Sequence, residues 1–223
     1  MKPLHILLIV FFMLIACKKD DDVIMVKDID GNVYHIVTIG SQMWMVENLK
    51  ATSYNDGTAI SNVTDSTQWS NMTSPAYCWY LNDEDNYKDP YGALYNWYTV
   101  ETGKICPTGW HVPTDDEWTT LIDNLGGERV AGGKLKETGT AHWESPNSQA
   151  TNESGFTALP SGFRFGSFGN GNFRSLGFSG YWWSSSEYYA TLAWVRGMVY
   201  DTGDVYRDFS FKDYGYSIRC VRD

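Results

Sequence analysis

One short segment of the chain carries a dense group of oxygen ligands. Asp83, Asp85 and Asp89 are candidate ligands for a calcium ion, which prefers carboxylate and carbonyl oxygens. The spacing departs from that of an EF-hand loop, because Lys88 stands where its glycine belongs and Leu94 where its closing glutamate belongs. The alternative is a solvated acidic loop without a metal. The sequence suggests no cofactor other than this candidate calcium ion.

A second candidate site is an aromatic, glycine-rich segment in the C-terminal half of the chain. Its candidate ligand-binding residues are Phe163, Arg164, Phe165, Phe168, Asn170, Asn172, Phe173 and Arg174. Aromatic rings can stack on the apolar faces of sugars while arginine and asparagine side chains bond to hydroxyl groups. We therefore expect a flexible loop that displays its rings to a ligand. The alternative is that these rings pack the loop against the core, as most of the 10 Trp, 15 Tyr and 10 Phe must.

No catalytic residue is predicted, and we expect the protein not to be an enzyme. His35, His111 and His142 show no metal-ligand spacing, and no Gly-x-Ser-x-Gly elbow occurs. A Ser-His-Asp arrangement that forms only in three dimensions stays open. The formal net charge of −10 disfavours nucleic acid and anionic lipid surfaces as partners.

The three cysteines of the C-terminal two thirds of the chain are expected to have two different roles. Cys106 precedes the best-defined helical motif and Cys220 lies in a strand pattern at the C-terminal end, so we predict a structural disulfide between them. Cys78 is then left over. It is either buried as a small apolar side chain or bonded to a different partner.

The elements that must position these residues are clearest between Cys106 and Gly127. Thr114 and Glu117 form the pattern of a capping box, which predicts a helix that begins directly after Thr114. One apolar face follows at helical spacing, formed by Trp118, Leu121, Ile122 and Leu125. Gly126 and Gly127 end the helix.

Elsewhere the patterns are short. Residues 28–49 predict two or three strands with turns at residues 30–32 and 40–41, and residues 50–77 an irregular surface loop. Residues 91–100 fit a helix or a strand, and residues 130–137 a second helix. Short aromatic strands follow, with a hairpin over residues 199–206. The fold class expected is α+β, with few helices and a loop-heavy antiparallel sheet.

The N-terminus resembles a bacterial lipoprotein signal peptide. Lys2 precedes an apolar run that ends in Leu14-Ile15-Ala16-Cys17 and is too short to span a bilayer comfortably. The resemblance implies that residues 1–16 are removed, that Cys17 is lipidated, and that residues 17–27 form a charged tether. It also implies that the protein is held on the outer membrane and exposed at the cell surface. An ordinary secretory signal with a chance cysteine is the alternative.

Several ordered motifs then resemble the Fibrobacter succinogenes major paralogous domain of bacterial surface lipoproteins, over residues 28–223. They are Cys78-Trp79-Tyr80, residues 92–97, residues 106–118, Gly132-Gly133-Lys134-Leu135-Lys136, residues 150–156, residues 180–185 and residues 217–221. That family is similar in pattern to the C-type lectin-like fold, shared with formylglycine-generating enzymes. The resemblance implies two helices, a disulfide to the last strand and long loops, but no settled activity.

The resemblance does not extend to the calcium-dependent sugar site of lectins. Ser145-Pro146-Asn147 and Trp194-Val195-Arg196 stand where that site would need its carboxylates. The sequence therefore predicts a lipid-anchored envelope protein with a non-enzymatic recognition domain for glycan or protein. The alternative is a structural surface-display domain without a small ligand.

Overall fold

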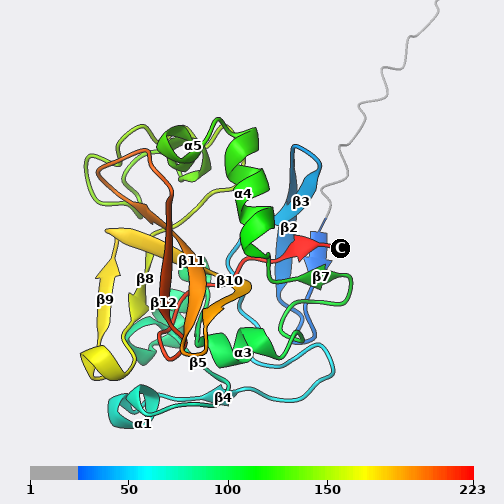
Figure 1. Cartoon of the computed structure of the whole chain (residues 1–223), viewed down its shortest axis with the longest axis vertical. Helices are drawn as coiled ribbons and strands as arrows, with labels where there is room; N and C mark the ends of the chain where they lie inside the picture. The colour runs from blue at the N-terminus through cyan, green and yellow to red at the C-terminus, as the bar shows by residue number, and fades with distance from the viewer. Residues whose placement is uncertain (1–24) are drawn as a thin grey trace, which may run out of the picture.

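The computed structural model describes residues 25–223, which fold as an α+β domain, as expected (Figure 1). The predicted signal peptide, Cys17 and most of the predicted tether lie outside the described residues. Within residues 25–223, no helix combines the length and apolarity that crossing a membrane requires.

The first sheet joins the two ends of the described chain. Its strands, in spatial order, are β1 (Met25–Lys27), β2 (Val33–Ile39), β3 (Gln42–Met45), β13 (Val221–Arg222) and β7 (Trp110–His111). The predicted turns before Val33 and after Ile39 are confirmed. The boundary of the tether is corrected, because its last three residues pair with β2 and belong to the folded domain.

The second sheet is the largest part of the fold. In spatial order it contains β12 (Tyr206–Phe211), β11 (Leu192–Val199), β10 (Ser179–Tyr189), β8 (Ser161–Arg164) and β9 (Phe173–Leu176). The predicted hairpin corresponds to the antiparallel pair β11 and β12. The sheet is not purely antiparallel, since β8 and β10 run parallel to each other.

A third, small sheet lies at the bottom of Figure 1, with short helices around it. Its strands are β4 (Ser61–Asn62), β5 (Ala76–Cys78) and β6 (Leu94–Tyr95), and the helices are α1 (Ser66–Ser70), η1 (Tyr80–Asn82), α2 (Glu84–Tyr91) and α3 (Trp97–Glu101). The expectation of an irregular surface loop over residues 50–77 is wrong in part. Trp69 in α1 is fully buried, and Tyr54, Ile60 and Val63 are buried as well, so apolar side chains fix this largely polar segment to the core.

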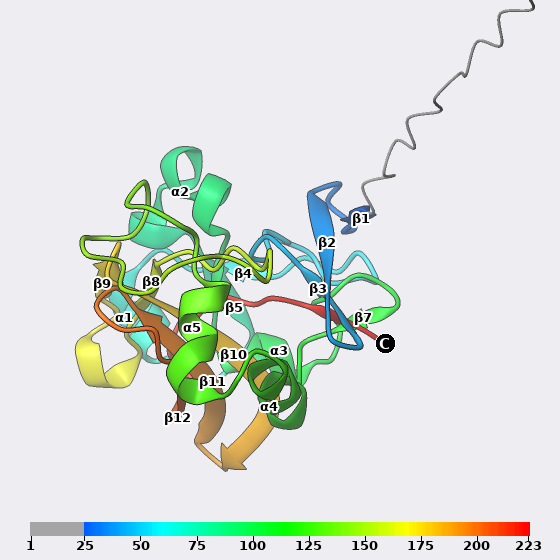
Figure 2. The ribbon, with the colours of Figure 1, turned by 90° about the horizontal axis from the view of Figure 1, so that it is seen from above.

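Helices α4 (Asp115–Asn124) and α5 (Glu128–Leu135) cover one face of β10 and β11 (Figure 2). The predicted capping box of α4 is present, with Thr114 and Glu117 each accepting from the other's backbone N–H. The predicted apolar face of α4 is buried against Trp44, Phe156 and Trp182. The cap, the apolar spacing and the glycine stop all predicted this helix, and the structure confirms it.

The predicted disulfide is confirmed. Cys106 and Cys220 are bonded across a sequence separation of 114 residues, which ties the segment before α4 to the C-terminal strand. Among the cysteines within residues 25–223, Cys78 stays unpaired and is fully buried. Burial raises the pKa of the Cys78 thiol to about 11, so the group is an inert apolar side chain.

Candidate functional site

Exposed aromatic rings single out one part of the surface. All ten tryptophans lie in the described chain and nine are buried, so the rings left for solvent are mainly Phe and Tyr. Phe168 and Tyr189 have exposed fractions of 72% and 65%, and Phe209 one of 44%. Large exposed rings that lie close together mark interaction surfaces more often than scattered ones do.

These rings gather on one face of β10, β11 and β12, beyond the part that α4 covers. The pairing of Trp194 with Phe209 and of Leu192 with Phe211 places these side chains on the same face. Tyr188 stacks on Phe209 with ring centroids 4.4 Å apart. We call the set Tyr188, Tyr189, Trp194, Phe209 and Phe211 the aromatic face.

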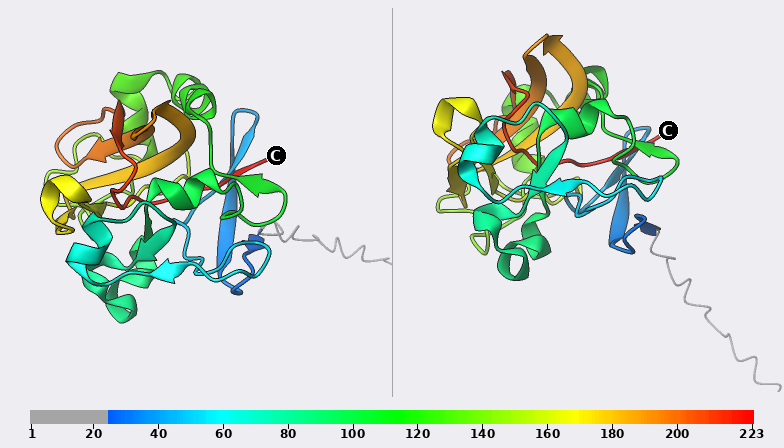
Figure 3. Two further views of the ribbon diagram at one scale, coloured as in Figure 1. Left: turned by 60° about the horizontal axis from the view of Figure 1, so that its bottom comes forward. Right: turned by 90° about the horizontal axis from the view of Figure 1, so that it is seen from below.

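A hollow of about 230 Å³ opens at the end of the aromatic face. Its aromatic walls are Tyr98, Phe168 and Phe211, and its polar lining comes from Ser167, Thr191, Lys212 and Asp213. Residues of the turn η2 (Ser167–Gly169), of helix α3 and of the turn between β10 and β11 line it. The turn η2 is the yellow segment at the left edge of both views in Figure 3. We call this site the Phe168 hollow.

Phe168 is the most exposed of the rings that line the hollow. Its ring stacks on Phe211 at a centroid distance of 4.6 Å, yet most of its surface remains exposed. Tyr98 is half-buried, and burial, with Asp213 and Glu101 nearby, raises the pKa of its phenol above the ordinary value. The Tyr98 hydroxyl therefore keeps its proton in neutral solution and can donate a hydrogen bond.

The lysine of the hollow carries no free charge. Lys212 is 5% exposed, its ammonium pairs with Glu187, and it lies 4.3 Å from the ring centroid of Trp97. Its backbone carbonyl accepts a hydrogen bond from the Trp97 N–H, which joins β12 to α3. Lys212 thus holds the end of β12 against α3, and its ammonium group is already paired with Glu187.

The loop that carries Phe168 is pinned on two sides. The guanidinium of Arg164 donates to the carbonyls of Gly171, Val63 and Thr64 at 2.9, 2.6 and 3.0 Å. On the other side, Asp213 accepts from the Ser167 N–H at 2.8 Å. A Cβ at position 166 would lie 2.2 Å from the Asp213 carboxylate, so any other residue there would displace this anchor.

The predicted ring platform is corrected by this arrangement. Arg164 is fully buried and holds the loop from within, so it is not available to a ligand. Phe163 and Phe165 pack on each other and on Tyr214, whereas Phe173 packs on Tyr80 in a different core. Exposed members of the predicted set are Phe168, Asn170, Asn172 and Arg174. Of these, Phe168 lines the hollow.

The structure does not bring the predicted calcium ligands together. Asp83 caps α2 and accepts from the backbone and side chain of Asn86, and Asp89 pairs with Lys50. Asp85 is exposed in the first turn of α2. Within residues 25–223, no group of three or more His, Cys, Asp or Glu side chains is arranged to hold a metal ion. The segment is the acidic start of a helix, where carboxylates interact favourably with the helix dipole.

An ion cluster at the start of α4 supports the aromatic face. Asp115, at the start of α4, accepts from Arg196 at 2.6 Å and from Arg207 at 2.7 Å. Arg207 in turn lies over Trp194, 3.7 Å from its ring centroid. Burial alone would raise the pKa of Asp115, but the two arginines outweigh it and hold that pKa below the ordinary value.

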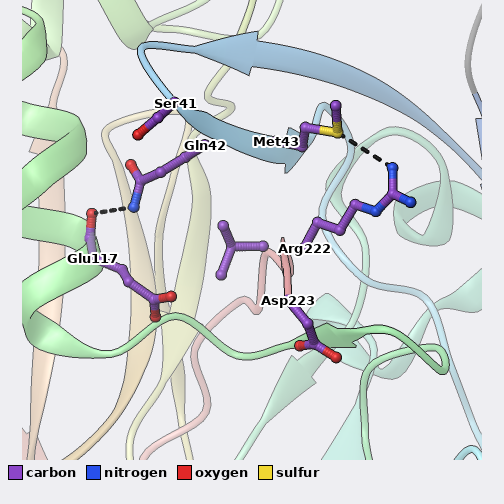
Figure 4. Close-up of a pocket in the computed structure, with 7 residues that line it drawn as sticks. Ser41, Gln42, Met43, Glu117, Arg222 and Asp223 are labelled. Carbon is purple, nitrogen blue, oxygen red and sulfur yellow. Dashed lines mark hydrogen bonds between the residues drawn. The ribbon is translucent and has the colours of Figure 1, made fainter.

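A larger hollow, of about 420 Å³, lies beside the C-terminal strand (Figure 4). Gln42 and Glu117 line it on one side, and Arg222 and Asp223 on the other. His111 lies between the two carboxylates, 2.6 Å from Asp223 and 2.9 Å from Glu117. Burial lowers the pKa of His111, but the hydrogen bonds to Asp223 and Glu117 raise it above the ordinary value. No aromatic ring lines this hollow, and its acids are already paired with His111.

Sequence reasoning missed most of the Phe168 hollow. Only Phe168 belonged to a predicted site, while Tyr98, Thr191 and Phe211 come from three other segments. A usable signal was present in residues 209–211, where Phe-Ser-Phe alternates in a strand pattern and so places two rings on one face.

Comparisons with known proteins give one finding. A family model matches residues 37–222, and its description is Fibrobacter succinogenes major domain. No curated protein and no solved structure matches the chain.

Proposed function

Since the chain belongs to the Fibrobacter succinogenes major domain family, whose name assigns no activity, we propose a function from the geometry. The domain is a non-enzymatic recognition module that binds glycan or protein through the Phe168 hollow and the aromatic face. Four separate segments converge on this site, which is typical of a recognition surface built on a rigid scaffold.

The observation that carries the proposal is the exposure of Phe168 on a loop that is held in place. An aromatic ring that is 72% exposed gains little for folding. Two side chains, the buried Arg164 and the half-buried Asp213, nevertheless hold the loop that carries this ring. A ring fixed in advance loses less conformational entropy when a ligand binds.

The remainder of the proposal concerns the place of the domain in the cell. We propose that Cys17 carries a lipid that anchors the protein to the outer membrane, with the domain at the cell surface. We also propose a C-type lectin-like fold, supported by the helix pair α4 and α5 and by the disulfide that reaches the last strand.

Lipid anchoring makes a direct prediction. Replacing Cys17 with alanine removes the thiol that would be acylated, so cells grown with radioactive palmitate are expected to leave the variant unlabelled. Cys78→Ala is the matched control and should be labelled like the wild type, because that thiol is buried. Equal labelling of the Cys17→Ala variant and the wild type would contradict the anchor.

Recognition is tested on arrays of glycans and envelope proteins, probed with the purified protein with and without Ca²⁺. At least one ligand is expected, and its signal should not depend on Ca²⁺, because the site has no built metal ligands. In a Phe168→Ala/Phe209→Ala variant the signal should fall by at least about tenfold, which corresponds to about 1.4 kcal/mol of binding free energy.

The control variant is Phe178→Ala, which removes a ring of similar exposure, 47%, outside the aromatic face. It should bind like the wild type. The absence of any ligand would favour a structural surface-display domain, a reading that the burial of nine tryptophans also supports. A ligand that binds all three proteins equally would place recognition elsewhere on the chain.

A further inference from the structure

We infer that the Phe168 hollow seats one sugar unit of an uncharged polysaccharide, and that the aromatic face contacts the units that follow it. This inference rests on the proposed function and narrows it to one class of ligand. It is carried by the size of the hollow, by its lining and by the charges around it.

The size of the hollow suits a single ring. Sites for drug-sized molecules usually measure roughly 300–1,000 Å³. The Phe168 hollow, at about 230 Å³, is smaller than this range. A folded peptide segment or a nucleotide would not fit in it, whereas one sugar unit would.

The lining matches the two surfaces of a sugar ring. The exposed ring of Phe168 provides an apolar platform for C–H groups. The hollow is also lined by Tyr98, Ser167 and Thr191, which carry hydroxyl groups, and by Asp213. Hydroxyls both donate and accept, so these residues complement the alternating hydroxyl groups of a sugar. An aliphatic protein side chain would leave these groups without partners, at a cost in desolvation.

Charge decides between uncharged and anionic glycans. Asp213 is the acidic residue that lines the hollow. The nearby cations are engaged, since Lys212 pairs with Glu187 and Arg207 with Asp115. Among its lining residues, the hollow therefore offers an anionic polymer an acidic side chain and no free cation, in a protein whose formal net charge is already −10.

The order of the rings favours a chain over a free monosaccharide. Phe211 forms a wall of the hollow, and Phe209 follows on the same face of β12, two residues away. Tyr188 and Tyr189 continue the row on β10. A ligand that begins in the hollow can thus extend along the aromatic face and gain contacts from further units.

The experiment measures binding of the full chain, purified in detergent, to two sets of immobilised polysaccharides. One set is uncharged (glucans, mannan, xylan) and the other anionic (polygalacturonate, chondroitin sulfate). Binding to at least one uncharged polymer and to no anionic polymer is expected. Phe168→Ala should weaken it about tenfold or more. Tyr98→Phe and Thr191→Val remove one hydroxyl each at nearly constant shape and should each weaken binding several-fold, with Phe178→Ala unchanged.

The outcomes separate this inference from the proposed function. If the ligand that depends on Phe168 is an anionic polymer or an envelope protein, the inference is overturned and the recognition site stands. If uncharged polymers bind but Tyr98→Phe and Thr191→Val bind as well as the wild type, the seating of a sugar in the hollow is overturned. If no ligand of any class depends on Phe168, both the inference and the proposed function fail. Thermal unfolding of each variant shows that the loss concerns binding and not folding.

Discussion

A variant in which Cys106 and Cys220 are both replaced by alanine is expected to lose about 4 to 5 kcal/mol of unfolding free energy. The bridge joins residues 114 positions apart, and a cross-link over so long a loop removes many conformations from the unfolded chain. Urea unfolding monitored by tryptophan fluorescence measures the difference. The bridge also ties the segment before α4 to the C-terminal strand, so we expect the loss to appear in the whole domain at once.

Two comparisons check this prediction. Cys78→Ala removes a buried thiol but no bridge, so it should cost only about 1 kcal/mol, the effect of a small cavity. A reducing agent should destabilise the wild type and leave the double variant unchanged. A wild type that unfolds at the same urea concentration with and without reductant would show that the bridge does not stabilise the domain.

Replacing Asp115 with alanine is expected to cost about 3 to 5 kcal/mol, the second largest effect. Arg196 is fully buried, and Asp115 supplies its carboxylate partner. Without Asp115, the positive charge of Arg196 would remain in the interior without compensation. The same substitution frees Arg207 from its position over Trp194, so ligand binding by the aromatic face should weaken as well.

The matched control is Asp116→Ala, in the same first turn of α4. Asp116 is exposed, so its loss removes only a favourable interaction with the helix dipole, about 0.5 kcal/mol. Chemical unfolding of both variants distinguishes the ion cluster from a helix-end effect. Similar losses for Asp115→Ala and Asp116→Ala would mean that the cluster contributes nothing specific.

Local patterns in the sequence were sufficient for part of this fold. The helix after Thr114 could be predicted because its cap, its apolar spacing and its stop all lie within fourteen residues. The Cys106–Cys220 bridge could be predicted because few cysteines were available. In both cases the deciding interaction involves residue types with few alternative roles.

Long-range contacts explain what the sequence could not predict. Arg164 was a candidate ligand because arginine beside phenylalanine suits sugar binding. Its real partners, the carbonyls of Val63 and Thr64, are about 100 positions away and are backbone atoms, which leave no mark in the sequence. The calcium site predicted around Asp83 was wrong for a similar reason. The Asp83 carboxylate caps a helix, and Asp89 pairs with Lys50 in another segment.

The Phe168 hollow shows the same limit for a site. Its walls come from η2, α3, the turn between β10 and β11, and the end of β12. An expectation of exposed rings around residue 168 was correct for Phe168 itself and wrong for the half-buried Phe163 and Phe173. Which ring of a run faces solvent depends on the packing of Asp213 and Gly166, and that is a property of the tertiary structure.

The central claim is that the exposed rings at the end of β10, β11 and β12 are a recognition surface. Hydroxyl-radical footprinting with mass spectrometry tests it most directly, because the technique reads the solvent exposure of each ring without mutation. With saturating ligand from the arrays, the oxidation rates of Phe168, Tyr189 and Phe209 should fall several-fold, and that of Phe178 should stay unchanged. Unchanged oxidation of Phe168 in the presence of saturating ligand would contradict the claim.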